Sequence, residues 1–218
     1  MEKRNQNLIS EELKKFNKII NYNPNGESLI SEKRSRQPWQ YNEEVITEAE
    51  PGEEEDESTE EFDFGAIRFR VLPTPGHTPV HVCLLTLSEQ TPILFSGDTL
   101  FNASAGNCFN GGDVDEMYDT FVRELQPLPD QTLLFPGHDY MKTNLNFAAS
   151  CEPLNDNVGY WQGQVERLSA DEMPYMTLGQ ERQYNPFLRL ASSGLLPQLQ
   201  GGNERETFKA LRAKRDAW

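Results

Sequence analysis

Hydrophobic and polar positions follow patterns that predict four strands in the middle of the chain. Apolar residues alternate with arginines over residues 66–72, which is the period of a half-buried strand. Residues 81–87 and 93–97 are near-continuous apolar runs, typical of strands covered on both faces. Residues 132–137 predict a further buried strand. Order is therefore expected to begin near Phe62.

Helical spacing replaces the strand pattern between and after these segments. Apolar residues recur at helical intervals over residues 113–125, and Asp113 can cap that helix. Helices are also expected at residues 141–150, near 155–168 and at 204–214. Strands with one interposed helix, followed by helices alone, indicate an α/β unit with a helical appendage.

The N-terminal part of the chain has a different character. Residues 9–20 could form an amphipathic helix with Ser10 as its N-cap. Between Glu43 and Asp63 lie twelve acidic residues and no lysine or arginine, so this run repels itself and has little to bury. We expect three parts, which are a polar, acidic and largely disordered segment at 1–61, an α/β domain at 62–139 and a helical domain at 140–218.

Composition excludes several classes of partner. The net charge of −15 argues against nucleic acid and against anionic membrane surfaces, which both need a basic face. The chain has no apolar run of transmembrane length and no secretory leader pattern. Its three cysteines form no CxxC pair, which is ordinary in a reducing compartment, so a cytoplasmic location is expected.

Candidate metal ligands follow three of the predicted strands. His77, Asp98 and His138 each come directly after a glycine at or beyond a strand end. Ligands at one edge of a sheet can converge, and imidazole with carboxylate suits zinc, iron or manganese. His81 begins a strand and is interpreted as structural, a hydrogen-bond partner of the ligands rather than a ligand.

Five motifs in order carry a resemblance to a known family. Together they resemble glyoxalase II, the hydroxyacylglutathione hydrolases, over about residues 62–218. This resemblance implies a metallo-β-lactamase αβ/βα sandwich, of which the C-terminal half is present, and a helical C-terminal domain that other branches of that fold lack. The motifs are TPGHTPVH (74–81), GDTLF (97–101), AGNCFNGG (105–112), PGHDY (136–140) and NPFLR (185–189).

The resemblance also implies a site and a reaction. His77 would bind one metal ion, His138 a second, and Asp98 would bridge them; the ions are usually zinc, with iron or manganese as alternatives. Such a pair lowers the pKa of a shared water from ~15.7 toward ~7. The hydroxide would attack the thioester of S-D-lactoylglutathione and release glutathione and D-lactate.

The implied glutathione pocket is only partly matched. Tyr140 corresponds to a tyrosine that contacts glutathione, and Arg212 and Arg215 correspond to the basic pair that holds its glycine carboxylate. Asn107 stands where a lysine or arginine normally reaches glutathione, and Phe109 stands where a tyrosine is common. One cation and one hydroxyl of the family pocket are therefore missing.

The family's remaining ligands come from an HxHxDH motif, and this chain has no histidine before His77. The chain therefore resembles an N-terminally incomplete member, whose apolar sheet face would be covered by self-association or by a partner. Three functions stay open: a thioester hydrolase, impaired in this chain; an inactive relative that acts as a binding protein; and a single metal ion held by His77, Asp98 and His138.

Overall fold

The computed structural model describes residues 60–218, except residues 66, 88–90 and 170–171. Contacts divide the chain into residues 1–55 and 56–218, and every described residue belongs to the second unit. The predicted helix at 9–20 and the predicted disorder of the acidic segment lie outside the described residues.

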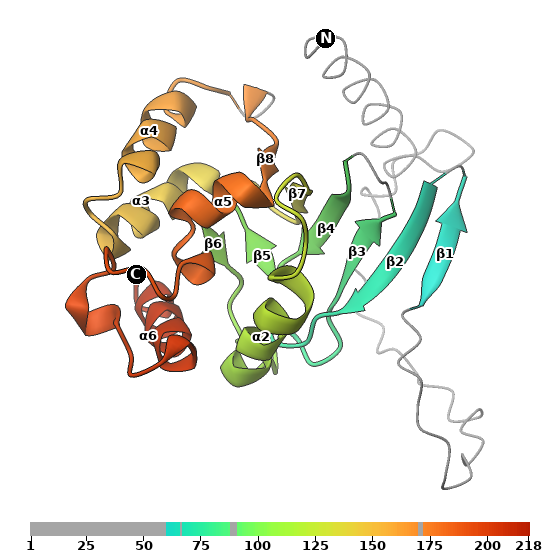
Figure 1. Cartoon of the computed structure of the whole chain (residues 1–218), viewed down its shortest axis with the longest axis horizontal. Helices are drawn as coiled ribbons and strands as arrows, with labels where there is room; N and C mark the ends of the chain where they lie inside the picture. Colours follow the sequence, from blue (N-terminus) through green and yellow to red (C-terminus); the bar gives the residue numbers. More distant parts are fainter. Residues whose placement is uncertain (1–59, 66, 88–90, 170–171) are drawn as a thin grey trace, which may run out of the picture. The chain divides into compact units, whose positions relative to one another are not determined.

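A mixed sheet forms one side of the described unit, with strand order β1-β2-β3-β4-β7-β8 (Figure 1). Neighbouring strands are antiparallel except β4 and β7, which are parallel. A separate hairpin pairs β5 with β6. The bounds are β1 (Glu61–Phe64), β2 (Ile67–Pro73), β3 (Val82–Thr86), β4 (Ile93–Gly97), β5 (Leu100–Phe101), β6 (Ser104–Ala105), β7 (Leu133–Pro136) and β8 (Met176–Thr177).

All four strands expected from the sequence are present as β2, β3, β4 and β7. The expectation that only helix and loop follow residue 137 was wrong, because β8 adds to the sheet beside β7. A strand of two residues is too short to show a period of two, and its pairing depends on a neighbour more than 40 positions earlier in the chain.

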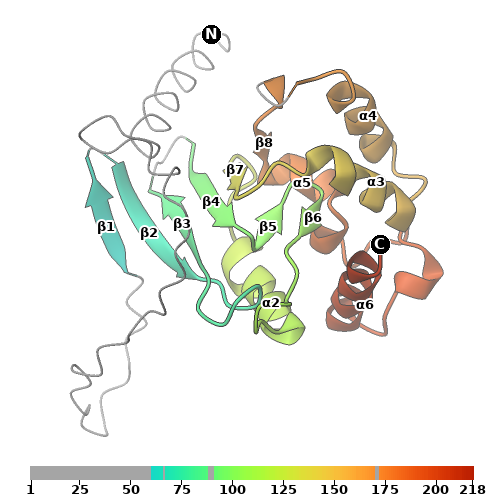
Figure 2. The same cartoon turned by 180° about the vertical axis from the view of Figure 1, so that it is seen from behind.

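The helices gather at the β7–β8 end of the sheet, away from β1 (Figures 1 and 2). Asp113 caps α2 as predicted, accepting hydrogen bonds from the backbone of Asp115 and Glu116. The helix then continues through a π-helical turn, η1 (Phe121–Leu125). The remaining bounds are α2 (Val114–Thr120), α3 (Met141–Cys151), α4 (Asp156–Val165), α5 (Leu178–Tyr184), η3 (Pro186–Leu188), η4 (Pro197–Leu199) and α6 (Glu204–Asp216).

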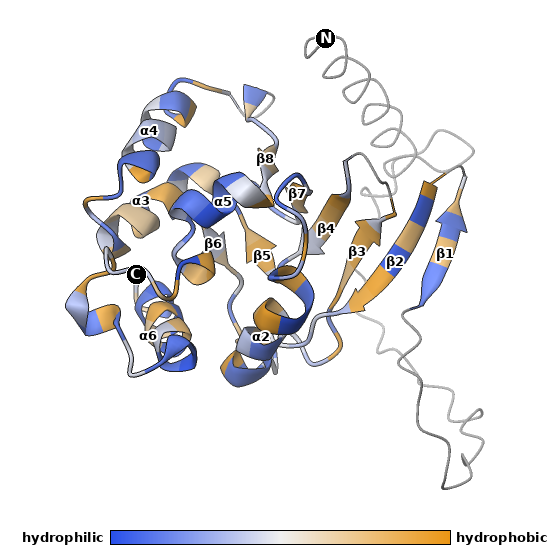
Figure 3. Cartoon of the chain, in the orientation of Figure 1, coloured by the Kyte–Doolittle hydropathy of each residue, from blue (hydrophilic) through white to orange (hydrophobic). Residues whose placement is uncertain are grey.

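One face of the sheet packs against α2 and η1. Leu72, Cys83, Leu94 and Leu134 of four strands join Met117 of α2 in one buried cluster. Figure 3 shows the apolar positions concentrated on β3, β4 and β5. This cluster continues into α6 and η3, so the sheet and the last helix share one core.

The opposite face carries a row of aromatic rings that crosses the sheet. Successive ring centroids in the row lie 4.9 to 6.2 Å apart. Phe69 in this row is 3% exposed, whereas the two end rings, Phe62 and Tyr175, are 41% and 52% exposed, so the face is not uniformly bare. Self-association through it stays a prediction. The row consists of Phe62, Phe69, Phe95, Phe135 and Tyr175.

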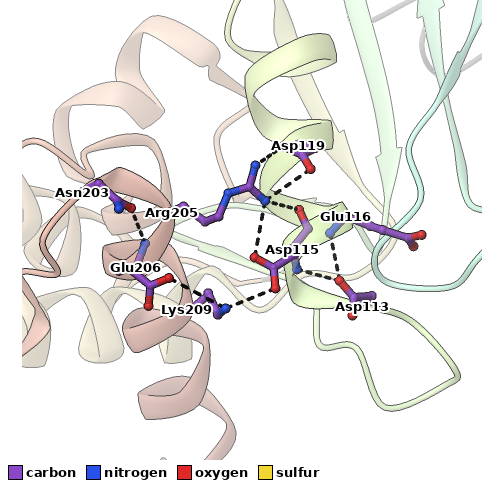
Figure 4. A network of polar contacts seen from close by, with 8 residues as sticks. All are labelled: Asp113, Asp115, Glu116, Asp119, Asn203, Arg205, Glu206 and Lys209. Atoms are coloured by element: carbon purple, nitrogen blue, oxygen red, sulfur yellow. Dashed lines mark hydrogen bonds and ion pairs between the residues drawn. The ribbon is translucent and has the colours of Figure 1, made fainter.

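Charged side chains fasten α6 to α2 on the outside of the shared core (Figure 4). Arg205 of α6 bonds to Asp115 and Asp119 of α2, and its guanidinium lies 4.5 Å from the ring centre of Tyr118. Lys209 adds a bond to Asp115.

In the part of the chain that the structure describes, no helix is long and apolar enough to cross a membrane.

Candidate metal site and adjoining cavity

Three strand ends bring the predicted ligands together. Strands β2, β4 and β7 run in the same direction, because β3 is antiparallel to both β2 and β4, and β7 is parallel to β4. Their carboxyl ends therefore meet at one edge of the sheet. His77, Asp98 and His138 lie just beyond those three ends.

Both imidazoles face the same oxygen atom. The Nε2 atom of His77 lies 3.6 Å from Oδ2 of Asp98, and the Nε2 atom of His138 lies 3.5 Å from it. Both distances are too long for good hydrogen bonds. Two ligands on one tetrahedral ion, each bonded at about 2.1 Å, stand about 3.4 Å apart. The spacing thus fits a carboxylate shared between two ions, one on each histidine.

The described residues supply part of the ligand set expected for a two-ion centre. Among the described residues, no three histidine, cysteine, aspartate or glutamate side chains are grouped so that they could hold one metal ion. The hypothesis of a single ion on His77, Asp98 and His138 gains no support from this grouping and stays a prediction. Each position has one histidine and the shared carboxylate, whereas catalytic zinc usually has three protein ligands.

The backbone of residues 106–107 fixes the ring of His77. Its Nδ1 atom lies 2.6 Å from the carbonyl oxygen of Asn107. A carbonyl oxygen can only accept, so Nδ1 carries the proton and Nε2 keeps its lone pair toward Asp98. The ring is thus held in the tautomer that a metal ligand needs.

His81 supports the site without joining it, as the sequence predicted. Its Nδ1 atom lies 2.9 Å from the hydroxyl oxygens of Thr74 and Thr99, and its Nε2 accepts from the backbone N–H of Asp98 at 3.3 Å. Burial, and then the neighbouring His77, lower the pKa of His81, which keeps the ring neutral. A neutral ring can accept from Asp98 and donate to a threonine at once.

Replacing His81 by alanine should lower stability more than it lowers metal content. The change removes the acceptor for the Asp98 N–H and leaves two threonine hydroxyls without that partner, so we expect a loss of about 1–3 kcal/mol in the free energy of unfolding. Urea titration and metal analysis of the same sample would measure both quantities. A variant that keeps its stability but loses its metal would make His81 a ligand instead.

A cavity of about 300 Å³ adjoins the metal site. Its lining brings together Tyr140, Asn107, Arg212 and Arg215, the four residues assigned to substrate binding from the resemblance. The ring of Tyr140 is stacked on His138 with centroids 5.2 Å apart, so the cavity opens beside the second metal position. The rest of the lining is Phe101, Ala105, Phe109, Asn144, Asp216 and Trp218.

The two arginines of this cavity differ in what they can still bind. Arg212 is 5% exposed and is bonded to the carbonyl oxygens of Ala105 and Gly106 and to the carboxylate of Asp216. Arg215 donates one hydrogen bond among the described residues, to the side-chain oxygen of Asn144. Arg215 is therefore the arginine with N–H groups to spare.

Aromatic rings hold the guanidinium of Arg215 in place. It lies 5.4 Å from the ring centre of Phe147 and 5.3 Å from that of Trp218. Burial and the neighbouring Arg212 lower its pKa from the usual value, although an arginine remains charged at neutral pH. A planar cation that contacts two rings and lines the cavity suits a carboxylate.

A larger cavity of about 540 Å³ lies elsewhere, beside η1 and the segment 189–193. It contains none of the predicted site residues. Its arginines, Arg182 and Arg189, are already paired with Asp130 and Glu152. We therefore place the functional site at the smaller cavity.

A buried carboxylate in α5 was not predicted from the sequence. Glu181 is fully buried and accepts from Asn102, from the backbone of Ala103, and from Tyr184 and Asn185. These bonds hold the turn of the β5–β6 hairpin, where Ala103 has φ of 59°. The hairpin carries Phe101, which lines the cavity and contacts the rings of both His138 and Tyr140.

Two family models match most of the chain. Residues 13–138 match the family described as "Metallo-beta-lactamase superfamily", and residues 139–218 match "Hydroxyacylglutathione hydrolase C-terminus". The superfamily match begins at residue 13, well before the start near Phe62 that the motifs predicted.

The relatives are longer than this chain. A hydroxyacylglutathione hydrolase of Polaromonas sp. (strain JS666 / ATCC BAA-500) is 42% identical over 160 residues, covering 70% of this chain and 60% of that protein. One of Nitrosococcus oceani is 42% identical over 145 residues, covering 66% and 53%. The crystal structure of ETHE1 from Myxococcus xanthus superposes with a TM-score of 0.43 at 24% identity, over 70% of this chain and 48% of that one.

The two family matches meet at residues 138 and 139, where the α/β part gives way to the helices. Recognition of the family and of the fold from the sequence is thereby confirmed. The metallo-β-lactamase fold is one that binds divalent metal ions. The chain therefore belongs to the metallo-β-lactamase superfamily, and within it to the hydroxyacylglutathione hydrolase family.

Proposed function

We propose that this chain forms the carboxyl-terminal part of a metal-dependent hydrolase of glutathione thioesters, with S-D-lactoylglutathione as its substrate and zinc as its metal. The observation that carries the proposal is the pair of imidazoles that converge on one oxygen of Asp98 beside a cavity with an available arginine. The chain spans 60% and 53% of the two curated relatives. The activity is therefore proposed for the protein that supplies the remaining ligands.

His77 and His138 would each hold one ion and Asp98 would hold both, and such a pair supplies hydroxide at neutral pH. Arg215 would bind the glycine carboxylate of glutathione through a charge-assisted contact, which contributes on the order of 1.5–3 kcal/mol. Tyr140, stacked on His138, would place the tripeptide beside the reacting carbonyl.

The test is hydrolysis of S-D-lactoylglutathione by the protein that joins this chain to the remaining ligands, supplied with zinc, together with metal analysis. Release of glutathione that depends on zinc and is abolished by a chelator is the expected result. No hydrolysis at any zinc concentration, with no metal retained, would reject the proposal.

Replacing either proposed ligand histidine by alanine should remove the metal held at its position. His77→Ala and His138→Ala each delete one of the two described ligands for an ion, and the remaining carboxylate alone is a weak site. Metal stoichiometry measured against the wild-type chain is the readout, with His81→Ala as the control that should retain metal. Unchanged stoichiometry in both ligand variants would remove this site from consideration.

A second function, an inactive relative that binds glutathione derivatives, is favoured by one observation. The described residues supply two ligands for each ion, and the whole chain contains only three histidines. Binding of glutathione without hydrolysis, lost on Arg215→Ala, would distinguish this function from the first.

A cytoplasmic location is part of the proposal. Cys83, Cys108 and Cys151 are all free, as in proteins of reducing compartments. Burial raises the pKa of the Cys83 thiol to about 11, so this thiol stays protonated and unreactive.

A further inference from the structure

The backbone of residues 105–107 is held from two sides. On one side Arg212 donates from Nη1 to the carbonyl oxygens of Ala105, at 2.9 Å, and of Gly106, at 2.7 Å. On the other side the carbonyl oxygen of Asn107 accepts from His77. The segment thus connects α6 to a proposed metal ligand.

Close packing at Gly106 makes this connection stiff. A Cβ atom built there would overlap the carbonyl oxygen of Asp98 and lie 3.3 Å from Nδ1 of His77. The segment therefore rests against both His77 and Asp98 with no space between. A shift of its carbonyl groups must move the acceptor on which the orientation of His77 depends.

Arg212 itself has little freedom. Its other edge is paired with Asp216 one helical turn along α6, with Nε and Nη2 at 2.9 and 2.7 Å from Oδ1. Its guanidinium also lies 5.7 Å from the ring centre of Phe187. With its N–H groups directed at two carbonyls and a carboxylate, Arg212 has few left for a ligand.

We propose that Arg212 is a positioning residue of the metal site, which fixes the tautomer and orientation of His77 through the backbone of residues 105–107. This inference rests on the proposed role of His77 as a ligand. It departs from the expectation that Arg212 and Arg215 together hold the substrate carboxylate. Arg212 stabilises the metal side of the site, and Arg215 is the arginine of the cavity with N–H groups left for a ligand.

The chain contains only three histidines, so its imidazole nitrogens can be observed one by one. Long-range ¹H–¹⁵N spectra of the full chain, freed of metal by a chelator and held at one pH, report which ring nitrogen carries the proton. In the wild type, His77 should show one tautomer, protonated at Nδ1. The His77→Asn variant assigns its signals.

Arg212→Lys keeps the charge but loses the fork that bonds two carbonyl groups, and we expect loss of the single-tautomer pattern of His77. Asp216→Asn, which weakens the pair on the other edge of Arg212, should give a smaller change in the same signals. Near-ultraviolet circular dichroism shows whether Arg212→Lys folds. If it does not fold, the His77 signals of Asp216→Asn test the proposal instead.

Two arginines of the same helix serve as controls. Arg205→Lys loosens the contact between α6 and α2 but touches none of residues 105–107. Arg215→Lys changes the cation of the cavity. Both should leave the His77 pattern as in the wild type.

An unchanged His77 pattern in folded Arg212→Lys would overturn the proposal. An equal change in Arg205→Lys would also overturn it, because a general loosening of α6 would then be the cause. Neither readout depends on hydrolysis or on bound metal, so failure of the proposed function would appear separately, in the assay with S-D-lactoylglutathione.

Discussion

Replacing Glu181 by alanine should lower the free energy of unfolding by about 2–5 kcal/mol. The carboxylate is completely buried and accepts four hydrogen bonds, including one of 2.8 Å from the backbone of Ala103 and one of 2.5 Å from the hydroxyl of Tyr184. Alanine leaves both donors buried without this acceptor and leaves a void in α5. Because Ala103 is held at a positive φ, the turn of the hairpin also loses the bond that keeps it there.

Urea unfolding would measure this loss, with Glu166→Ala as the matched control. Glu166 is exposed after the end of α4, and its removal should change stability by no more than about 0.5 kcal/mol. If the two variants unfold alike, the buried network does not hold the hairpin.

The same carboxyl predicts how stability depends on pH. Burial raises the pKa of Glu181, and the hydrogen bonds from its neighbours oppose that rise only in part. The folded state therefore binds the proton more tightly than the unfolded chain, in which the pKa is about 4.3. The stability that this proton contributes is complete below pH ~4.3 and is lost as the pH rises through the higher folded value.

Comparison with Glu181→Gln isolates this dependence, since glutamine keeps the side-chain length but does not titrate. The stability of the wild type relative to this variant should fall as the pH rises above about 4.3. A difference that stays constant from pH 4 to 8 would mean that burial does not raise the pKa of Glu181.

The candidate ligands were predictable because each follows a strand in a short glycine turn. A period of two located β2, and runs of apolar residues located β4 and β7. The structure shows that these strands run in one direction, which brings His77, Asp98 and His138 together at one edge. The family resemblance likewise placed Tyr140 and Arg215 at the cavity, where the structure has them.

What the sequence did not predict depends on contacts between residues far apart. The different roles of Arg212 and Arg215 depend on which carbonyl groups each guanidinium can reach. Arg212 reaches those of Ala105 and Gly106, which are more than 100 positions earlier in the chain. Glu181 stands among polar residues of α5 and gives no apolar period, so its burial could not be inferred. Short elements such as β5, β6 and β8 are determined by pairing alone.

Replacing Gly106 by alanine should disrupt the metal site and lower stability by at least about 3 kcal/mol. The new methyl group would overlap the carbonyl oxygen of Asp98 and lie 2.9 Å from its carbonyl carbon. Both obstacles are backbone atoms, which cannot rotate away as the end of a side chain can. The φ of Gly106 is not in the left-handed region, so alanine would not strain the backbone there. The overlap with Asp98 alone causes the expected effect.

Gly159→Ala should raise stability, in contrast to Gly106→Ala. Gly159 is exposed in α4 and a Cβ atom there meets nothing within 4 Å, so alanine should raise stability by up to about 1 kcal/mol through its higher helix propensity. Urea unfolding of both variants, with the His77 spectrum as the local readout, separates steric overlap from the general effect of replacing glycine. A folded Gly106→Ala chain that keeps the wild-type His77 tautomer would mean that residues 105–107 can move without moving His77. The backbone of these residues would then not transmit the position of α6 to the metal site.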